Sequence, residues 1–403
     1  MLLNRFGPGI LITAAFIGPG TITTASMAGA NFGFALLWAL ALSVFATIVL
    51  QEMAARLGLV TRAGLAEAMR DTFHNQLLGK FSILLVICAV GFGNAAYEAG
   101  NIAGAALAIT SVTDINRSTA ALTLGVMSAV LLASGRYRVL EIALICLVLI
   151  MSTIFILTAF VVTPPAEEIL SSLIQPTLPA GSAWTVIALI GTTVVPYNLF
   201  LHANVVQEKW NSSVPVKSAL SQSRWDTGLS VSLGGLISLA ILATAATAFF
   251  QTGLEFTGQS MAAQLEPLLG PSAQYVFSLG LFASGLTSAI TAPLAAAYAV
   301  CGALGWSQGL ASRGFRLIWG AVLLTGTVFA ALGTKPLSAI VFAQIANGFL
   351  LPIVAIFLLV VMNRNELLGK YCNGPIANTL GALVVLIVAG LAAVKLGHFL
   401  GLL

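Results

Sequence analysis

Eleven long apolar segments are the feature that most constrains the fold of this chain. Each can cross the hydrocarbon core of a bilayer, which takes about 20 residues of α-helix. Only 7% of the 403 residues are charged, against roughly 25% in soluble proteins. Backbone groups inside a bilayer must bond internally, so such segments form helices. We therefore expect an all-α polytopic membrane protein with spans at 9–33, 36–58, 80–110, 118–134, 139–163, 183–209, 226–252, 272–304, 314–333, 337–363 and 376–401.

Basic residues in the loops predict the orientation. If the N-terminus is cytoplasmic, 14 of the 17 lysines and arginines lie on the cytoplasmic side, and Arg117, Lys335 and Lys395 lie outside. Cytoplasmic loops carry the excess of basic residues. We expect a protein of the bacterial inner (plasma) membrane, with its N-terminus inside and its C-terminus outside. The net charge of +4 comes from these loops, so the bilayer is the expected partner and nucleic acid is not.

Two of the apolar segments are interrupted by proline. Gly18-Pro19-Gly20 breaks the first span, and Val195-Pro196 breaks the sixth. Proline lacks a backbone donor and clashes with the preceding turn, and broken backbone in a bilayer is tolerated where it faces protein or a wet cavity. Paired breaks in two halves of a chain are typical of secondary-transporter binding sites. The predicted substrate-binding residues around the breaks are Gly18, Gly20, Thr21, Thr24, Val195, Tyr197 and Asn198.

The broken spans also divide the chain into two halves. Spans 1–5 (residues 1–163) and spans 6–10 (183–363) each contain five crossings, so the halves have opposite orientations. A proline-rich loop at 164–182 connects them, and residues 364–403 carry span 11. Broken helices in matching positions indicate an inverted repeat, although no residue-by-residue identity between the halves is evident.

Span 3 carries a carboxylate inside the bilayer. Gly91, Asn94, Glu98, Asn101 and Ala105 follow at intervals of three and four, so they share one helical face. A buried charge must be paired, hydrated or protonated. We expect Glu98 to carry protons and Asn101, on the same face, to take part in proton coupling; the alternative is a protonated structural glutamate bonded to a neighbouring helix.

Two further spans carry candidate polar residues. His202 lies four residues after Asn198, and histidine titrates near neutral pH, so we expect a role in proton coupling. The alternative is a packing hydrogen bond. Gln344 and Asn347 share a face of span 10, which we expect to face the substrate. Hydroxyl residues in span 8, Ser288 among them, are ordinary helix-packing groups.

Catalytic motifs do not occur in the chain. HExxH, GxSxG, a P-loop and a Cys/His cluster are all missing, and the four cysteines have no CxxC spacing. We expect a transporter rather than an enzyme or an ATP-driven pump, with no cofactor.

The chain resembles the natural resistance-associated macrophage protein (Nramp) family of transporters over most of its length. The first two helices of that family are similar to Gly7-Pro8-Gly9, Ala28-Gly29-Ala30, Leu36-Leu37-Trp38 and the segment from Ala54 to Gly58. Its sixth helix resembles Pro196 to His202, its eighth Gly285 to Thr291, and its tenth Gln344 with Pro352. The resemblance implies a LeuT-type fold, with two inverted five-helix repeats plus an eleventh helix, and proton- or ion-coupled alternating access.

The departures from the family bear on the substrate. The family breaks read Asp-Pro-Gly-Asn and Met-Pro-His-Asn, whose Asp, Asn and Met bind metal; here Gly18, Thr21 and Val195 replace those ligands, and Tyr197 replaces the histidine. The third span of the family carries Asp and Glu, where this chain has Glu98 and Asn101. Without anionic or soft ligands, dehydrating a divalent ion is costly. With the aspartate absent, the half-helix N-termini at the two breaks would favour a ligand that carries an anionic group.

We therefore expect a carrier of a small organic carboxylate or amino-acid-like solute, with no metal site. The alternative is an atypical divalent metal/proton symporter that uses Asn198, Gln344 and Glu98. A third possibility, a membrane sensor that retains the fold without transport, would show no saturable uptake.

Overall fold

A computed structural model describes residues 8–9, 17–72, 80, 83–84, 86–134, 138–307, 309–332 and 335–399. Within these residues all regular structure is helical. The first half of the chain contains α2 (Pro19–Phe32), α3 (Leu37–Thr61), α4 (Leu65–Thr72), the π-helical segment η1 (Ile87–Phe92), α6 (Gly93–Thr110), α7 (Arg117–Ser134), α8 (Arg138–Val162) and α9 (Ala166–Ile174).

The second half of the chain is equally helical. It contains α10 (Ala183–Thr193), α11 (Pro196–Lys209), α12 (Val216–Phe249), η2 (Ser260–Leu265), α13 (Glu266–Leu269), η3 (Gly270–Ser272), α14 (Ala273–Leu304), α15 (Arg313–Ala331), α16 (Pro336–Met362), α17 (Asn365–Leu368), η4 (Gly369–Tyr371) and α18 (Pro375–Phe399).

Every predicted span contains helix in this structure. Among the described residues, eight helices are long and apolar enough to cross a membrane, or nine if the bent pair at 365–391 is one span. The first span is represented by α2, its second half; the half-helix expected before Gly18 lies outside the described residues. The third span begins with the π-helical segment at Ile87–Phe92 before α6.

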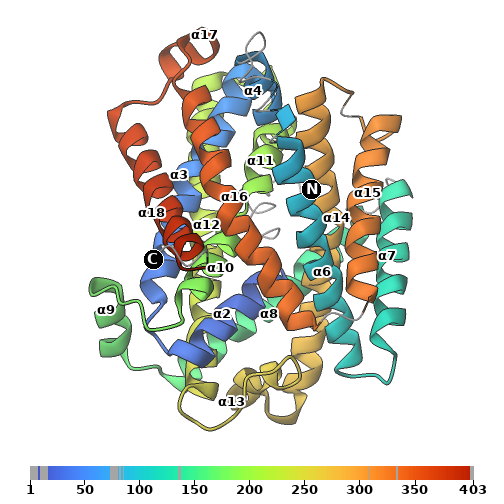
Figure 1. Cartoon of the computed structure of the whole chain (residues 1–403), viewed down its shortest axis with the longest axis vertical. Coiled ribbons are helices and arrows are strands. Elements are labelled where there is room, and N and C mark those ends of the chain that lie inside the picture. The colour runs from blue at the N-terminus through green and yellow to red at the C-terminus, as the bar shows by residue number, and fades with distance from the viewer. Residues whose placement is uncertain are drawn as a thin grey trace.

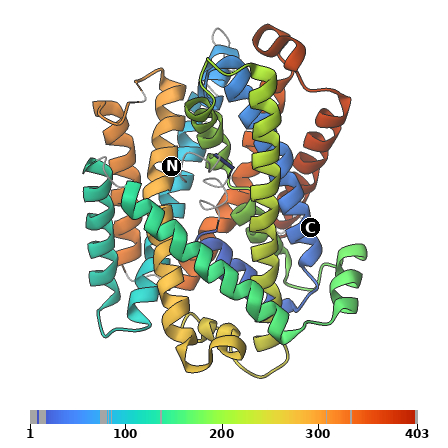
Figure 2. The same ribbon diagram turned by 180° about the vertical axis from the view of Figure 1, so that it is seen from behind.

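Helix α6 lies inside the bundle and positions the site. It packs against α14, α16 and α15, whereas α2 packs against α12 and α10 against α16. In Figure 1, α15 and α7 flank one side of the bundle, and α3 and α18 flank the other. Figure 2 shows α8 crossing obliquely over the opposite face, where it packs on α12 and α14. The peripheral helices thereby enclose α2, α6 and α10, whereas α16 lies on the near face in Figure 1 and is about half buried.

Glycines allow the central helices to approach backbone to backbone. A Cβ atom on Gly191 of α10 would lie 2.0 Å from the carbonyl oxygen of Gln344 in α16. A Cβ on Gly29 of α2 would lie 2.2 Å from the carbonyl oxygen of Leu242 in α12. Small residues are typical of membrane helix contacts, because lipid provides no hydrophobic drive and close packing must provide the attraction.

The backbone is extended at both predicted breaks, and at the second a described helix ends directly before it. Gly18 is extended (φ −101°, ψ −175°), and α2 begins at Pro19. Helix α10 ends at Thr193, Val195 is extended (φ −74°, ψ 119°), and α11 begins at Pro196. Proline is favoured at the first helical position, where the missing N–H has no intrahelical partner to lose. The two prolines therefore start new half-helices.

Candidate functional site

The two helix breaks meet in the middle of the bundle. The Thr21 hydroxyl, in the first turn of α2, lies 2.9 Å from the Thr192 hydroxyl, near the end of α10. The Thr47 hydroxyl of α3 donates to the Ser43 carbonyl of its own helix at 2.7 Å and, at the longer distance of 3.3 Å, to the Thr193 carbonyl of α10. One side-chain hydrogen bond thus joins the start of α2 to the end of α10, and a second joins α3 to the end of α10.

Side chains from other helices occupy the space beside the glycines of the first break. A Cβ on Gly20 would lie 2.3 Å from Nε2 of Gln344, so the amide of α16 occupies the space beside this glycine. A Cβ on Gly18 would lie 2.8 Å from Oγ of Ser288 and 3.7 Å from the hydroxyl oxygen of Tyr97. Helices α16, α14 and α6 therefore all reach the Gly-Pro-Gly break.

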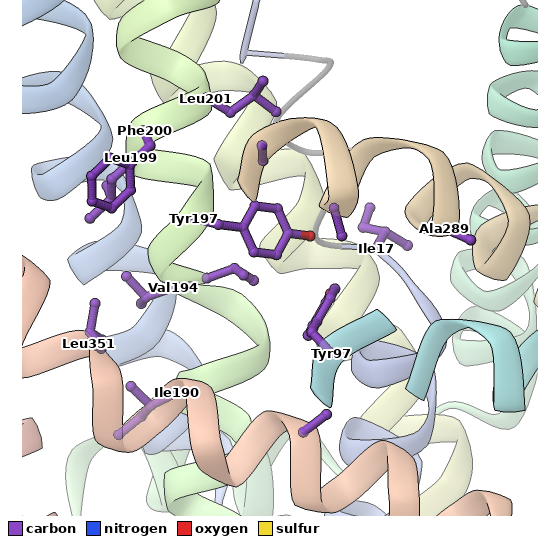
Figure 3. Close-up of a cluster of buried hydrophobic side chains, with 14 of the residues drawn as sticks. Ile17, Tyr97, Ile190, Val194, Tyr197, Leu199, Phe200, Leu201, Ala289 and Leu351 are labelled. Carbon is purple, nitrogen blue, oxygen red and sulfur yellow. The ribbon is translucent and has the colours of Figure 1, made fainter. Parts of the chain in front are cut away.

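The second break contributes an aromatic ring. Tyr197, in the first turn of α11, contacts Tyr97 of α6 edge to face, with ring centroids 5.2 Å apart. Figure 3 shows the Tyr197 ring projecting from α11 toward Tyr97 and Ile17. Edge-to-face contact aligns the positive edge of one ring with the negative face of the other. The two rings join α11 to α6 directly beside the first break.

Several buried polar atoms around the breaks have no hydrogen-bond partner in the described part of the chain. An unpaired buried polar group costs about 1–3 kcal/mol, so such a cluster is typical of a site that a ligand completes. The atoms belong to residues 0–2% exposed and are Thr24 Oγ1, Asn198 Oδ1 and Nδ2, Ser288 Oγ, Gln344 Oε1 and Asn347 Nδ2. Because these residues are so deeply buried, the structure has the site closed to bulk solvent.

The predicted coupling residues lie at two other helix contacts. Asn101 donates its side-chain N–H to Oε2 of Glu98 at 3.2 Å. A Cβ on Gly326 of α15 would lie 2.5 Å from Cγ of Glu98, so the glutamate side chain packs against α15. The amide of Asn94, on the same predicted face, donates to the Ala292 carbonyl of α14. This polar face of α6 is directed at α14 and α15.

His202 lies at the contact between α11 and α3. Its Nδ1 is 2.8 Å from Oε1 of Gln51, and the ring is fully buried. Its Nε2 has no partner among the described residues. The structure thus brings together Gly18, Gly20, Thr21, Tyr197 and Gln344, and it separates Glu98 with Asn101 from His202.

Sequence reasoning missed Tyr97 and took Ser288 for packing. The available signal was a glycine stripe: Gly93, Tyr97, Gly100 and Gly104 share one face of α6. A Cβ on Gly104 would lie 2.4 Å from Pro19, and one on Gly100 would lie 3.3 Å from Ile340 of α16. Glycines at this spacing indicate close helix approach, and so mark the face that adjoins the first break.

The donor set at the breaks is neutral. The atoms are hydroxyls, amides and backbone groups, and the described residues contain no group of three or more His, Cys, Asp or Glu that could hold a metal ion. Such a set can hydrogen-bond a polar ligand, and two half-helix N-termini add partial positive charge.

The family model described as natural resistance-associated macrophage protein-like matches residues 9–397. Among curated relatives, the divalent metal cation transporter MntH of Aeromonas hydrophila is 28% identical over 395 residues, covering 97% of this chain and 95% of the relative. The MntH of Yersinia pestis is 28% identical over 396 residues, covering 97% and 94%.

Solved structures with a similar fold include the Eremococcus coleocola manganese transporter, with a TM-score of 0.77 and 22% identity over 98% of this chain and 87% of that one. Mhp1, a nucleobase-cation-symport-1 family transporter, has a TM-score of 0.59 and 12% identity over 98% and 93%. These likenesses confirm the predicted all-α LeuT-type fold. The division into repeats at 1–163 and 183–363 stays a prediction.

Proposed function

The chain belongs to the natural resistance-associated macrophage protein family, and from that premise we propose that it is a proton- or ion-coupled secondary transporter whose substrate is a small organic solute. That it is an integral membrane transporter and not an enzyme follows from the family itself. Alternating access at the two broken helices is the expected mechanism, because closure of the bundle around the breaks buries the site, and opening on one side at a time would expose it.

The single observation that carries the substrate proposal is the neutral donor set at the breaks. Gly18 and Val195 offer neither a carboxylate nor a thioether, and Ser288, Asn198 and Gln344 bring hydroxyl and amide atoms. A half-helix terminus contributes at most about 2 kcal/mol to ion binding. Dehydrating a divalent cation costs far more, so anionic ligands must offset it.

The same groups suit a small molecule with a carboxylate. The N-termini of α2 and α11 favour an anionic group, and the unpaired amide and hydroxyl atoms can hydrogen-bond its polar atoms. Tyr97 and Tyr197 provide flat aromatic walls. We propose that a carboxylate or amino-acid-like compound binds among these residues, with Gly18, Gly20, Thr21, Thr24, Val195 and Asn347 completing the site.

A divalent metal ion is the second candidate substrate. It is favoured by the relatives, which are described as divalent metal cation transporters. Metal binding here would use Asn198, Gln344 and Glu98. The Cβ and Cγ atoms of Glu98 pack against Gly326, and Oε2 accepts from Asn101, so metal binding would require the carboxylate to share or give up that hydrogen bond. The fold is compatible with either substrate, since one fold neighbour is a manganese transporter and another has bromovinylhydantoin bound.

Isothermal titration of the purified protein separates the two candidates. We expect no heat from Mn²⁺ and saturable binding of one compound from a panel of small carboxylates and amino acids. Gly18→Asp places a negative charge at the N-terminus of α2, so it should weaken binding of that compound at least tenfold. Gly18→Asn, which has the same shape and no charge, should weaken it much less. Equal losses in the two variants would show that charge at Gly18 does not act on the ligand.

Two further results would change the assignment. Micromolar Mn²⁺ binding that disappears in Glu98→Gln would establish the metal role. Absence of saturable uptake of any tested solute into proteoliposomes would favour the non-transporting sensor.

Proton coupling through Glu98 is tested separately. Glu98 is fully buried, and its Oε1 has no partner in the described part of the chain. We expect Glu98→Gln to abolish pH-gradient-driven uptake while substrate binding in the titration stays within about threefold, because glutamine keeps the shape of the side chain and its capacity to hydrogen-bond but cannot release a proton. Uptake that still follows the pH gradient in this variant would remove Glu98 from the coupling mechanism, leaving His202 as the candidate.

A further inference from the structure

A groove lies on the outer surface of the bundle, along the first part of α12, and none of the residues at the helix breaks lines it. It has a volume of about 730 Å³ and runs between the first turns of α12 and η4. Its lining is formed by Lys217, Leu220, Ser221, Arg224, Trp225, Gly228, Leu229, Ser232 and Tyr371. Gly228 deepens the groove, because no atom lies within 4 Å of the position its Cβ would take.

One end of the groove is positively charged. Lys217 and Arg224 line it, and Nζ of Lys370 lies 5.4 Å from the centroid of the Tyr371 ring. Glu52 is the neighbouring carboxylate: it accepts from Nε of Arg224 at 2.9 Å and from Nη2 of Arg56 at 3.0 Å. One carboxylate shared by two guanidinium groups leaves a net positive charge beside the groove.

Asp226, the neighbouring carboxylate on α12, is not among the residues that line the groove. Its Oδ2 accepts the backbone N–H of Gly9 at 2.7 Å, so its carboxylate is engaged with the chain before α2 rather than with the groove. Lys217 and Arg224 are exposed, and Arg224 keeps most of its side chain accessible beyond its contact with Glu52.

The other end of the groove is apolar and continues along the helix. Trp225 is 70% exposed and Leu229 is 64% exposed. Leu233 and Leu236 continue the exposed stripe at helical spacing. Helix α12 has 34 residues, which is about 51 Å of helix, well beyond the roughly 30 Å hydrocarbon core. Its first turns therefore extend to the level of the lipid headgroups, where tryptophan is enriched.

We propose that this groove binds an anionic phospholipid, with its phosphate between Lys217 and Arg224 and an acyl chain along Leu229 and Leu233. The groove has cations at headgroup level, then the indole of Trp225, and then the notch at Gly228 that leads to exposed leucines. This order matches the order of chemical groups along such a lipid. Basic pockets on the cytoplasmic side of transmembrane helices are typical anionic-lipid sites. The predicted orientation places this end of α12 at the cytoplasmic leaflet, where anionic lipids attract basic residues. The proposal is independent of the transported substrate.

Quenching of tryptophan fluorescence by brominated lipid tests the proposal. The full-length protein is reconstituted into phosphatidylcholine bilayers that contain a small, equal mole fraction of either brominated phosphatidylglycerol or brominated phosphatidylcholine. We expect stronger quenching by the brominated phosphatidylglycerol, and we expect that excess to disappear in Trp225→Phe. Equal quenching by the two lipids, or an excess that survives in Trp225→Phe, would overturn the proposal.

Charge variants test the headgroup contact. Removing both cations in Lys217→Ala/Arg224→Ala should raise the mole fraction of phosphatidylglycerol needed for half of the excess quenching about 25-fold, since each basic residue near the surface is worth roughly a fivefold change. Lys217→Ala alone leaves the Glu52 contacts in place and should give about fivefold. Arg313→Ala, at the exposed start of α15, is the matched control and should change nothing.

The remaining outcomes also decide the question. A change in Trp225 fluorescence on adding soluble glycerol phosphate, with no excess quenching by brominated phosphatidylglycerol, would mean that a free phosphate, and not a lipid, occupies the site. Protection of Trp225 from both brominated lipids would mean that protein, such as a second copy of the chain, covers the groove. Either result would overturn the lipid assignment.

Discussion

At each helix break a proline begins the following helix, but the two breaks contribute different groups to the site. The first, at Gly18-Pro19-Gly20, has no side chain of its own beyond the proline ring and receives Gln344, Ser288 and Tyr97 from three other helices. The second, at Val194-Val195-Pro196, is followed by Tyr197 and Asn198, which carry polar groups into the bundle. The first break provides space for side chains of other helices, and the second provides polar side chains of its own.

This difference shows that a broken helix alone does not make a binding site. At the first break, removal of side chains lets neighbouring amides and hydroxyls approach the half-helix N-terminus. At the second, the break re-aims the chain so that the first turn of α11 faces α6. The Thr21–Thr192 hydrogen bond at 2.9 Å joins the two breaks. If one break moves during transport, either this hydrogen bond must break or the other break must move with it.

The largest effect is expected next to the second break, at Gly191. Its Cβ would meet backbone atoms of Gln344 and Gly348 at 2.0 and 2.5 Å, and backbone cannot rotate away. Gly191→Ala should therefore force α10 from α16 and destabilise the protein by about 1–3 kcal/mol or more. Thermal unfolding in detergent measures the change. Gly320→Ala in α15, where a Cβ would meet nothing within 4 Å, is the control and should leave the unfolding temperature unchanged or slightly raised. An equally stable Gly191→Ala protein would contradict the close contact.

A smaller effect on folding and a specific effect on function are expected at the first break. In Gly20→Ala the new methyl group meets the end of the flexible Gln344 side chain at 2.3 Å, which can turn aside. We expect near-normal unfolding and at least tenfold weaker substrate binding in the titration. The double variant Gly20→Ala/Gln344→Ala should bind no worse than Gln344→Ala alone, because the clash is gone. Additive losses would show that the two residues act independently.

The smallest effect is expected for the aromatic pair. Tyr97→Phe keeps the ring that contacts Tyr197 and should change substrate affinity less than threefold. Tyr97→Leu removes the edge-to-face contact, worth about 0.5–1.5 kcal/mol, and should weaken binding by roughly three- to tenfold. Binding that falls equally in both variants would assign the role of Tyr97 to its hydroxyl and not to its ring.

The predicted breaks and most of the predicted site residues come together because their signals are local. Proline at the start of each half-helix and glycine beside Pro19 act within one turn of the chain. Gln344 could be predicted as a site residue from the sequence, because a polar amide stands out in an apolar span. Its position beside Gly20 could not be predicted, since nothing in span 10 identifies the helix that it faces.

The third span shows where sequence reasoning reached its limit. Spacing correctly placed Asn94, Glu98 and Asn101 on one face, and the carboxylate on that face made Glu98 the candidate proton carrier. The structure directs it at α14 and α15, and the adjacent face with Tyr97 adjoins the breaks. A helix that is buried on all sides has no solvent face to orient it, so its rotation depends on which neighbour fits its glycines.

The sequence by itself determined that this chain crosses a membrane many times and that a proline begins a helix within two of its spans. Those properties follow from apolar length and from the covalent limits of proline, which act over neighbouring residues. Only the tertiary structure decided that Tyr97 and Ser288 lie at the first break and that Glu98 packs against Gly326. Those positions depend on the rotation and contact of helices far apart in the chain, which close packing of small residues fixes and local sequence does not encode.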